Sequence, residues 1–159
     1  MEQHKKIIAT LCYIMNGDEV LMLHRTKKEN DMHKDMYNGL GGKIEKGEDP
    51  YTCVIREVYE EAGVDIVPLY AGNLTFENFQ KDVDWEVHLF IAHGFRGSLS
   101  ECNEGDLVWV NKKDLFNLDL WPGDRIFLKK MFENKFFFGR FKYEHGKLLD
   151  HKIFDCSVL

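Results

Sequence analysis

The stretch that most constrains the fold is GGKIEKGEDPYTCVIREVYEEAGV, residues 41–64, because it specifies both ends of one helix. Asp49 is able to accept from the unpaired N–H groups of a first helical turn, and Pro50 suits the first helical position. Gly63 suits the left-handed residue that stops a helix. The sequence therefore predicts a helix of about a dozen residues between Pro50 and Gly63. Apolar residues at helical spacing form its predicted core-facing stripe: Tyr51, Val54, Ile55, Val58 and Ala62.

The same helix concentrates negative charge on one edge. Glu57 lies one turn before Glu60 and Glu61, so the three carboxylates fall within an arc of about 100°. Carboxylates at this spacing repel one another, and a hard divalent cation, Mg²⁺ or Mn²⁺, is the natural partner of an all-oxygen cluster. A solvated acidic face is the alternative. The ion is favoured because Gly41 and Gly42, whose bare backbone allows close approach of an ion or a phosphate, lead directly into the helix.

The rest of the chain is dominated by predicted strands. Residues 6–15 and 19–25 are β-rich and separated by Asn16-Gly17-Asp18, which predicts an antiparallel hairpin. Residues 26–38 are polar and irregular, and they predict a surface loop that borders a site. Asp124 is able to cap a second helix through residues 126–134. Further strands are predicted at residues 69–79, 85–95 and 107–110, with a closing hairpin at residues 136–143 and 147–154.

Length, charge and cysteine content bound the class of protein. A chain of 159 residues with 44% hydrophobic residues predicts one domain over residues 1–159. The net charge of −6 gives no basic surface for a nucleic-acid polymer. The polar start and the short apolar run after it predict a cytoplasmic protein without a membrane segment, and nothing in the sequence indicates an obligate protein partner. Four scattered cysteines without a CxxC pair predict reduced thiols rather than a zinc site or disulfides.

One motif carries a family resemblance. Gly42, then five residues, Glu48, seven residues and REVYEEAGV at 56–64 fill every fixed position of the Nudix box, GX5EX7REUXEEXGU, which spans residues 42–64. The chain as a whole resembles the MutT/MutX-type oxidised-purine nucleoside triphosphatases of the Nudix hydrolase family. The resemblance implies an α/β/α sandwich with a mixed sheet and a loop–helix–loop catalytic motif. It also implies Mg²⁺-dependent hydrolysis of a small nucleoside diphosphate derivative.

The resemblance assigns roles residue by residue. Glu48 and Arg56 are expected to brace the loop and the helix, since an Arg fork pairs bidentately with a carboxylate. Glu104, just before a predicted strand, corresponds to a further acidic ligand or base, although an ordinary loop glutamate fits the pattern equally well. Either Glu57 or Glu104 takes the proton from the attacking water. The expected catalytic residues are Arg56, Glu57, Glu60, Glu61 and Glu104, and the expected metal ligands are Gly41 through its carbonyl, Glu57, Glu60, Glu61 and Glu104.

The stretch WPGD, residues 121–124, corresponds to the base-binding end. By resemblance Trp121 stacks on a purine and Asp124 bonds its edge, whereas on pattern alone the stretch is a helix start with Trp121 in the core. A mammalian relative has two consecutive acids after the proline, and Gly123 replaces the first of them here. Lys27, Lys28 and His33 are assigned no role. The expected substrate-binding residues are Thr10, Arg25, Asn38, Leu40, Gly41, Gly42, Lys43, Trp121 and Asp124.

These observations support three hypotheses. The leading one is Mg²⁺-dependent hydrolysis of oxidised purine nucleoside triphosphates, from 8-oxo-dGTP to 8-oxo-dGMP and pyrophosphate, as sanitation of the nucleotide pool. A second keeps the enzyme class and changes the substrate to ADP-ribose, a nucleotide sugar or a dinucleoside polyphosphate. A third is a non-catalytic nucleotide-binding module. The complete set of box carboxylates disfavours this last hypothesis, since a binding module needs no metal-activated water.

Overall fold

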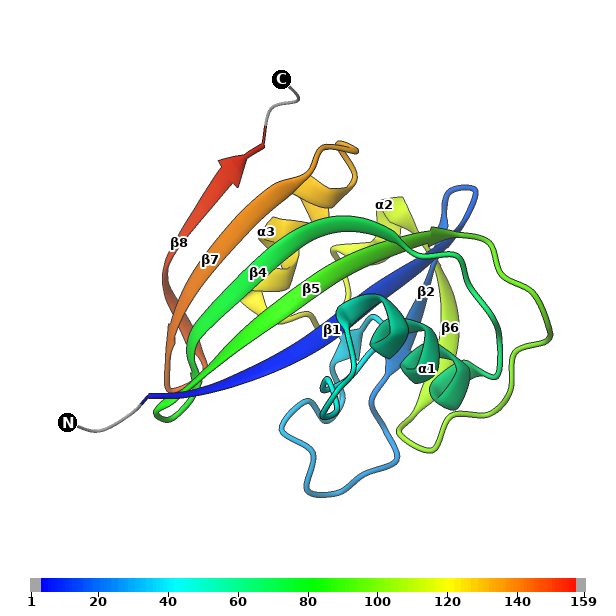
Figure 1. The fold of residues 1–159 in the computed structure, drawn as a ribbon, viewed down its shortest axis with the longest axis horizontal. Coiled ribbons are helices and arrows are strands. Elements are labelled where there is room, and N and C mark those ends of the chain that lie inside the picture. Colours follow the sequence, from blue (N-terminus) through cyan, green and yellow to red (C-terminus); the bar gives the residue numbers. More distant parts are fainter. Residues whose placement is uncertain (1–3, 157–159) are drawn as a thin grey trace.

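The computed structural model describes residues 4–156 as a twisted sheet with helices on both faces (Figure 1). The strands follow the order β3-β2-β1-β5-β4-β7-β8, and β6 pairs with β2 outside this path. The elements are β1 (Lys5–Asn16), β2 (Glu19–His24), β3 (Tyr37–Asn38), α1 (Pro50–Ala62), β4 (Leu69–Gln80), β5 (Val83–His93), β6 (Asp106–Asn111), α2 (Lys112–Leu115), α3 (Pro122–Met131), β7 (Phe137–Glu144) and β8 (Lys147–Asp155).

The sheet is mixed, as predicted. β1 and β2 form the expected antiparallel hairpin, with Met15 opposite Val20. β1 also pairs in parallel with β5, and β4 pairs in parallel with β7. The remaining strand pairs are antiparallel, including the predicted closing hairpin of β7 and β8. The parallel pairing of β1 with β5 places the N-terminal strand in the middle of the sheet.

Two hydrophobic cores lie on opposite faces of the sheet. Successive side chains of a strand point to opposite faces, so β1 contributes to both cores. Cys12 and Ile14 pack in one cluster with Val58 of α1, whereas Tyr13 packs in the other with Phe127 of α3. Figure 1 shows α1 on one side of the strands and α2 and α3 on the other. The predicted three-layer α/β/α arrangement is confirmed.

Helix α1 has the predicted ends. The Asp49 carboxylate accepts from the Thr52 N–H at 2.7 Å, and Gly63 adopts the left-handed conformation with φ of 73°. The predicted stripe is wrong at its first residue, because Tyr51 is 49% exposed. The buried face includes Cys53 and Glu61 and is therefore rotated toward the carboxylate edge. This rotation brings Glu61 into the protein interior.

The second predicted helix starts differently. Trp121 is the N-terminal cap residue of α3 and makes no capping bond through its side chain. Asp124 therefore does not cap the helix; it lies in the first turn and is only 7% exposed. Helix α3 ends at Met131, short of the predicted end at residue 134. The single-turn helix α2 and the two-residue strand β3 were not predicted, because both are too short to show a period.

The aromatic run at residues 136–138 is only partly buried. Of the three residues at 136–138, Phe137 is fully buried, whereas Phe138 is 46% exposed, so packing into the core explains only part of this run. No disulfide joins the cysteines, all of which lie within the described residues. The four thiols are therefore free in this structure, and their reduced state stays a prediction.

Candidate active site

The glycine loop lies directly against strand β1. The Gly42 carbonyl accepts from the Thr10 N–H at 2.8 Å, and Cys12 and Leu40 exchange two backbone hydrogen bonds. Gly41 has φ of 153°, and a Cβ there would lie 2.1 Å from the Thr10 carbonyl oxygen. Only glycine allows this close approach. Leu40 is fully buried and anchors the loop in the α1-side core, so its side chain does not face a substrate.

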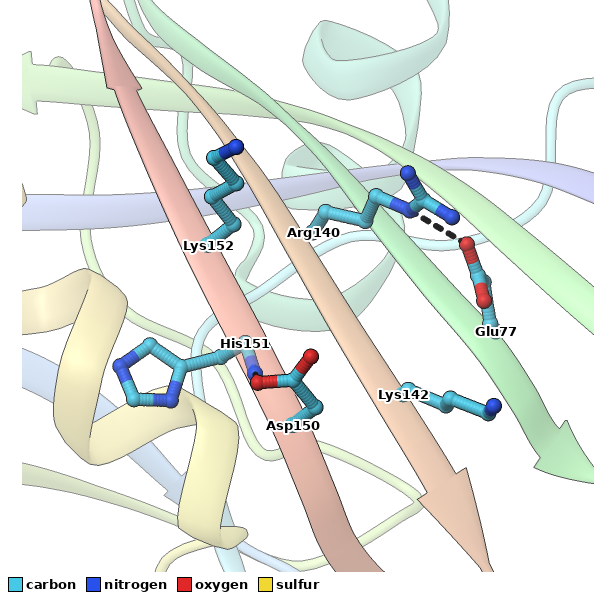
Figure 2. Close-up of a pocket in the computed structure, with 6 residues that line it drawn as sticks. All are labelled: Glu77, Arg140, Lys142, Asp150, His151 and Lys152. Carbon is cyan, nitrogen blue, oxygen red and sulfur yellow. Dashed lines mark hydrogen bonds and ion pairs between the residues drawn. The ribbon is translucent and has the colours of Figure 1, made fainter.

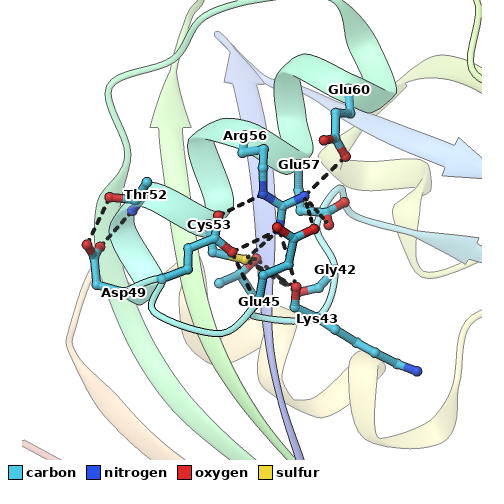
Figure 3. Close-up of polar contacts among 11 residues, drawn as sticks. Gly42, Lys43, Glu45, Asp49, Thr52, Cys53, Arg56, Glu57 and Glu60 are labelled. Carbon is cyan, nitrogen blue, oxygen red and sulfur yellow. Dashed lines mark hydrogen bonds and ion pairs between the residues drawn. The ribbon is translucent and has the colours of Figure 1, made fainter.

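Arg56 of α1 holds the box carboxylates together (Figure 3). Its Nε and Nη2 donate to Glu48 Oε2 and Oε1 at 2.7 and 2.9 Å, which is the predicted bidentate pair. Its Nη1 contacts Glu57 Oε1 at 2.9 Å and Glu60 Oε2 at 3.2 Å. The Arg56 guanidinium lowers the pKa of Glu48 to about 2. Arg56 thus fixes the loop to the helix and orients Glu57, whereas Glu60 remains largely exposed.

Glu57 and Glu61 project from α1 toward the glycine loop. A Cβ at Gly42 would lie 2.5 Å from the Glu57 carboxyl carbon, so this glycine makes room for the carboxylate. Glu61 Oε1 accepts from the Gly41 N–H at 2.8 Å. Burial, together with the carboxylates of Glu104 and Glu57, raises the pKa of Glu61 to about 8. Burial also raises the pKa of Glu57 above its ordinary value, although Arg56 opposes the shift.

Glu104 is brought to this place by strand pairing. Strand β6 pairs with β2, with Asp106 opposite His24, so the residues before β6 lie beside the end of β2. Glu104 Oε2 contacts Arg25 Nη1 at 2.9 Å, and its Oε1 contacts Lys28 Nζ at 3.1 Å. Lys28, to which the sequence assigned no role, is therefore an ion-pair partner of a candidate ligand.

These carboxylates suit a divalent cation by their chemistry. Glu57, Glu61 and Glu104 supply only oxygen donors. The negative charge of Glu104 contributes to the raised pKa values of both Glu57 and Glu61. Within residues 4–156, no three or more His, Cys, Asp or Glu side chains are already arranged around a common ion position. They are instead engaged by Arg56, the Gly41 N–H and Arg25. The donor set fits Mg²⁺ by its chemistry, and each of the three carboxylates contacts a group of this chain.

A cleft of about 690 Å³ connects the carboxylates with an aromatic pocket. Most of the residues proposed from the sequence line it, whereas Leu40, Arg56, Glu60 and Glu61 do not. Those that line it are Thr10, Arg25, Asn38, Gly41, Gly42, Lys43, Glu57, Glu104, Trp121 and Asp124. The cleft therefore brings the glycine loop and the WPGD stretch, which are far apart in the sequence, into one site.

Asp124 lies at the aromatic end of the cleft. Its carboxyl group is almost fully buried, and burial alone raises its pKa to about 8. Trp121 and Phe79 pack edge to face there, with ring centroids 4.8 Å apart. The hydroxyl of the neighbouring Tyr13 is buried and has no hydrogen-bond partner in the described part of the chain. This end offers aromatic faces and one carboxyl group whose proton is retained near neutral pH.

Packing against Tyr143 explains why position 123 is a glycine. Its N–H donates to the Tyr143 hydroxyl at 2.8 Å, and a Cβ at Gly123 would lie 2.6 Å from that oxygen. Tyr143 is fully buried and cannot easily move away. An acidic side chain at this position is therefore incompatible with the packing of Tyr143.

Sequence reasoning missed several residues of the cleft. Asp31, Met32 and His33 come from the loop at 26–38, which was expected only to border a site. Trp121 Nε1–H donates to His33 Nδ1 at 2.7 Å, a contact between residues 88 positions apart in the chain. No local pattern predicts such a contact. The other lining residues that were missed are Ala9, Leu11, Asn30, Gly39, Glu45, Phe76, Phe79, Gln80, Trp85 and Val87.

A second depression, of about 150 Å³, lies on the outer surface of β4, β7 and β8 (Figure 2). Its lining is charged and includes an ion pair between Glu77 and Arg140. None of the box residues reaches it. The larger cleft is therefore the candidate active site.

Comparison with known proteins identifies the family of the chain. Residues 5–131 match the NUDIX domain family. The chain is 28% identical to an oxidized purine nucleoside triphosphate hydrolase of Danio rerio over 154 residues, covering 96% of this chain and 97% of the relative. It is 35% identical to an uncharacterized Nudix hydrolase, YvcI, of Bacillus subtilis, covering 72% of each chain. The crystal structure of a MutT protein from Bacillus halodurans superposes with a TM-score of 0.82 at 25% identity, covering 92% of this chain and 97% of that one.

None of the helices within residues 4–156 has the length and apolar character needed to span a membrane. The family match covers most of the chain, and the mixed sheet with few helices is the fold of the MutT neighbour. The chain therefore belongs to the Nudix hydrolase family, whose members act on nucleotides and generally use divalent metal ions such as Mg²⁺.

Proposed function

We propose that this Nudix hydrolase converts oxidised purine nucleoside triphosphates to monophosphates and pyrophosphate, with 8-oxo-dGTP as the preferred substrate. The observation that carries the proposal is the cleft that runs from Glu57 and the glycine loop to Trp121 and the buried Asp124. A nucleotide whose triphosphate lies at the carboxylate end of the cleft places its base at the aromatic end. Relatives from Danio rerio and Mus musculus are both named oxidized purine nucleoside triphosphate hydrolases, which supports the same substrate class.

The phosphate end is proposed to work through the box carboxylates. Glu57, Glu61 and Glu104 would hold Mg²⁺, with the Gly41 carbonyl and the exposed Glu60 as further ligands. When bound, Mg²⁺ neutralises phosphate oxygens and acidifies a water molecule. The Arg56 fork keeps Glu57 in place, while Thr10, Arg25, Gly42 and Lys43 line the path of the phosphate chain.

The proton of the attacking water has two candidate acceptors. Both Glu57 and Glu104 line the cleft, and each is a carboxylate held by a cation, Arg56 or Arg25. An acceptor must lie within hydrogen-bond reach of the water. Attack on the β-phosphorus yields the monophosphate and pyrophosphate without a covalent enzyme intermediate.

The base end is proposed to recognise a purine. The Trp121 indole supplies a stacking face, and Asp124 and Asn38 are the polar groups that meet the base edge. With Gly123 in place of an acid, Asp124 is the acidic group of this stretch that remains for edge recognition. A buried carboxyl group that has no partner discriminates strongly against a base that leaves it unpaired.

We further propose that the chain forms a single Nudix domain with its catalytic box at residues 42–64. We also propose that it acts in the cytoplasm. The free thiols of Cys12, Cys53, Cys102 and Cys156 support a reducing compartment. Expression with a fluorescent tag and cell fractionation would test this location.

A substrate panel tests the function. Purified protein with Mg²⁺ is assayed on 8-oxo-dGTP, dGTP, ADP-ribose, a nucleotide sugar and a dinucleoside polyphosphate, with separate detection of pyrophosphate and orthophosphate. We expect the highest kcat/KM for 8-oxo-dGTP and release of pyrophosphate. A preference for ADP-ribose refutes the substrate class, and binding without Mg²⁺-dependent turnover indicates a non-catalytic module.

Glu57→Gln tests the mechanism in the same assay. The variant keeps the size of the side chain and removes the charge, so we expect loss of turnover with an unchanged fold. Glu101→Gln, a change at an exposed glutamate outside the cleft, is the matched control. Hydrolysis by Glu57→Gln at the rate of the unmodified protein would remove the proposed mechanism.

A further inference from the structure

His33 makes a polar contact with Trp121 at the aromatic end of the cleft. Its Nδ1 accepts from the Trp121 Nε1–H at 2.7 Å, and the two rings meet edge to face with centroids 5.6 Å apart. The imidazole also stacks on Phe79, at 5.8 Å between centroids. Trp121 is thus held on one side by Phe79 and at its N–H by His33, so the indole has a defined orientation before any ligand binds.

The contact requires a particular state of His33. A nitrogen that accepts a hydrogen bond carries no proton, so the imidazole is neutral with its proton on Nε2. Burial lowers the pKa of His33, and the nearby Arg25 cation lowers it further, which outweighs the opposing effects of Asp31 and Glu104. The environment therefore favours the form that accepts from Trp121.

Asp31 connects His33 with Arg25, which lies toward the phosphate end of the cleft. One carboxylate oxygen, Oδ1, accepts from the His33 backbone N–H at 3.0 Å. The other, Oδ2, accepts from Arg25 Nε at 2.7 Å. The Arg25 side chain in turn contacts Glu104 at 2.9 Å. A continuous series of contacts thus joins the residue that holds the indole to a carboxylate at the other end.

We propose that His33 is a positioning residue that sets the orientation of the Trp121 indole as the stacking wall for the base, and that Asp31 holds His33 in place. This inference rests on the proposed function, because it assigns a specificity role within the base pocket. A side chain that is already ordered loses less conformational freedom on binding. Removing the His33 contact should therefore weaken nucleotide binding by about 3- to 10-fold.

Two substitutions of His33 separate the hydrogen bond from the packing. His33→Leu retains a side chain of similar bulk and removes the acceptor. His33→Asn places an amide oxygen near the position of Nδ1 and restores it. His93→Leu, at an exposed histidine outside the cleft, is the matched control.

The first measurement is independent of activity. The NMR signal of the Trp121 indole N–H is recorded in ¹⁵N-labelled protein without nucleotide and is assigned by its absence in Trp121→Phe. Its chemical shift and its rate of hydrogen exchange are then compared between the unmodified protein and the variants. We expect faster exchange and a changed shift in His33→Leu, and values close to the unmodified protein in His33→Asn and His93→Leu. An indole signal that His33→Leu leaves unchanged overturns the inference.

The second measurement is steady-state kinetics with the best substrate of the panel. We expect KM to rise about 3- to 10-fold in His33→Leu with little change in kcat, and to return toward the original value in His33→Asn. Equal KM in His33→Leu and the unmodified protein overturns the positioning role. If the protein does not hydrolyse oxidised purine nucleotides, the proposed function fails, while the indole signal still decides whether His33 orients Trp121.

Discussion

Asp124→Asn should stabilise the protein increasingly as pH rises. The Asp124 carboxyl group is 7% exposed, and burial raises its pKa from 3.8 to about 8. Between these values the folded state keeps a proton that the unfolded state has lost, so the stability of the unmodified protein falls with rising pH. Asparagine has nearly the same shape and carries no charge. The variant should therefore match the unmodified protein near pH 4 and exceed it above pH 8.

The pKa difference sets the size of the effect. Each pH unit over which the folded state holds an extra proton is worth about 1.4 kcal/mol, so a rise from 3.8 to about 8 gives an upper limit of about 6 kcal/mol. Asp124 borders a cleft open to solvent, and water reaching the ionised carboxylate reduces the cost of burial. We therefore expect a gain of about 2 kcal/mol at pH 9, or roughly 4–8 °C in melting temperature.

Thermal unfolding of both proteins, without nucleotide, at pH values from 4 to 9 measures this difference. Comparison at each pH cancels the contribution of every other titrating group. Asp119→Asn, a change at an exposed carboxylate shortly before Trp121, is the control and should show no such trend. A melting-temperature difference between Asp124→Asn and the unmodified protein that stays constant across this range would refute the argument from burial.

Three further predictions concern the glycine loop, the contact between Gly123 and Tyr143, and the ion pair of Glu48 with Arg56. In Gly42→Ala the new Cβ would lie 2.5 Å from the Glu57 carboxyl carbon, so we expect a folded protein with roughly 10- to 100-fold lower kcat/KM and weaker activation in an Mg²⁺ titration; full activity contradicts this. Tyr143→Phe leaves the Gly123 N–H without its buried acceptor and should cost about 1–3 kcal/mol in urea unfolding, whereas Tyr51→Phe at an exposed position should cost almost nothing. Glu48 has its pKa lowered to about 2 by Arg56, so its contribution is complete above pH 4.5 and is lost as pH falls toward 2. Glu48→Gln should therefore destabilise the protein at pH 7 and progressively less in acid, and an equal loss of stability at pH 7 and pH 2 would contradict the ion pair.

Local sequence patterns predicted the parts of the fold that depend on near neighbours. The ends of α1 follow from Asp49, Pro50 and Gly63, because capping needs only the adjacent backbone. The first and last hairpins follow from their Asn-Gly and His-Gly turns. The exposed Tyr51 was predicted wrongly, because helical spacing defines a stripe but not which side of it the sheet covers.

The base end of the cleft could be predicted only in part. Trp121 and Asp124 were proposed through a resemblance, and both line the cleft. Their setting was not predictable, because the buried environment of Asp124 depends on residues from other elements. Gly123 departs from the pattern of a relative, and the reason is the hydroxyl of Tyr143, twenty residues later in the chain.

The sequence by itself determined the carboxylate helix, its glycine loop and the family, since these depend on spacing within one short segment. Glu104 and Trp121 were proposed through the resemblance, and only the tertiary structure decided which distant residues they contact. Pairing of β6 with β2 carries Glu104 to Arg25, and the packing of α3 against the sheet sets Trp121 where His33 meets it. The physical reason is that strand order and register, rather than local preference, decide which side chains meet across a cleft.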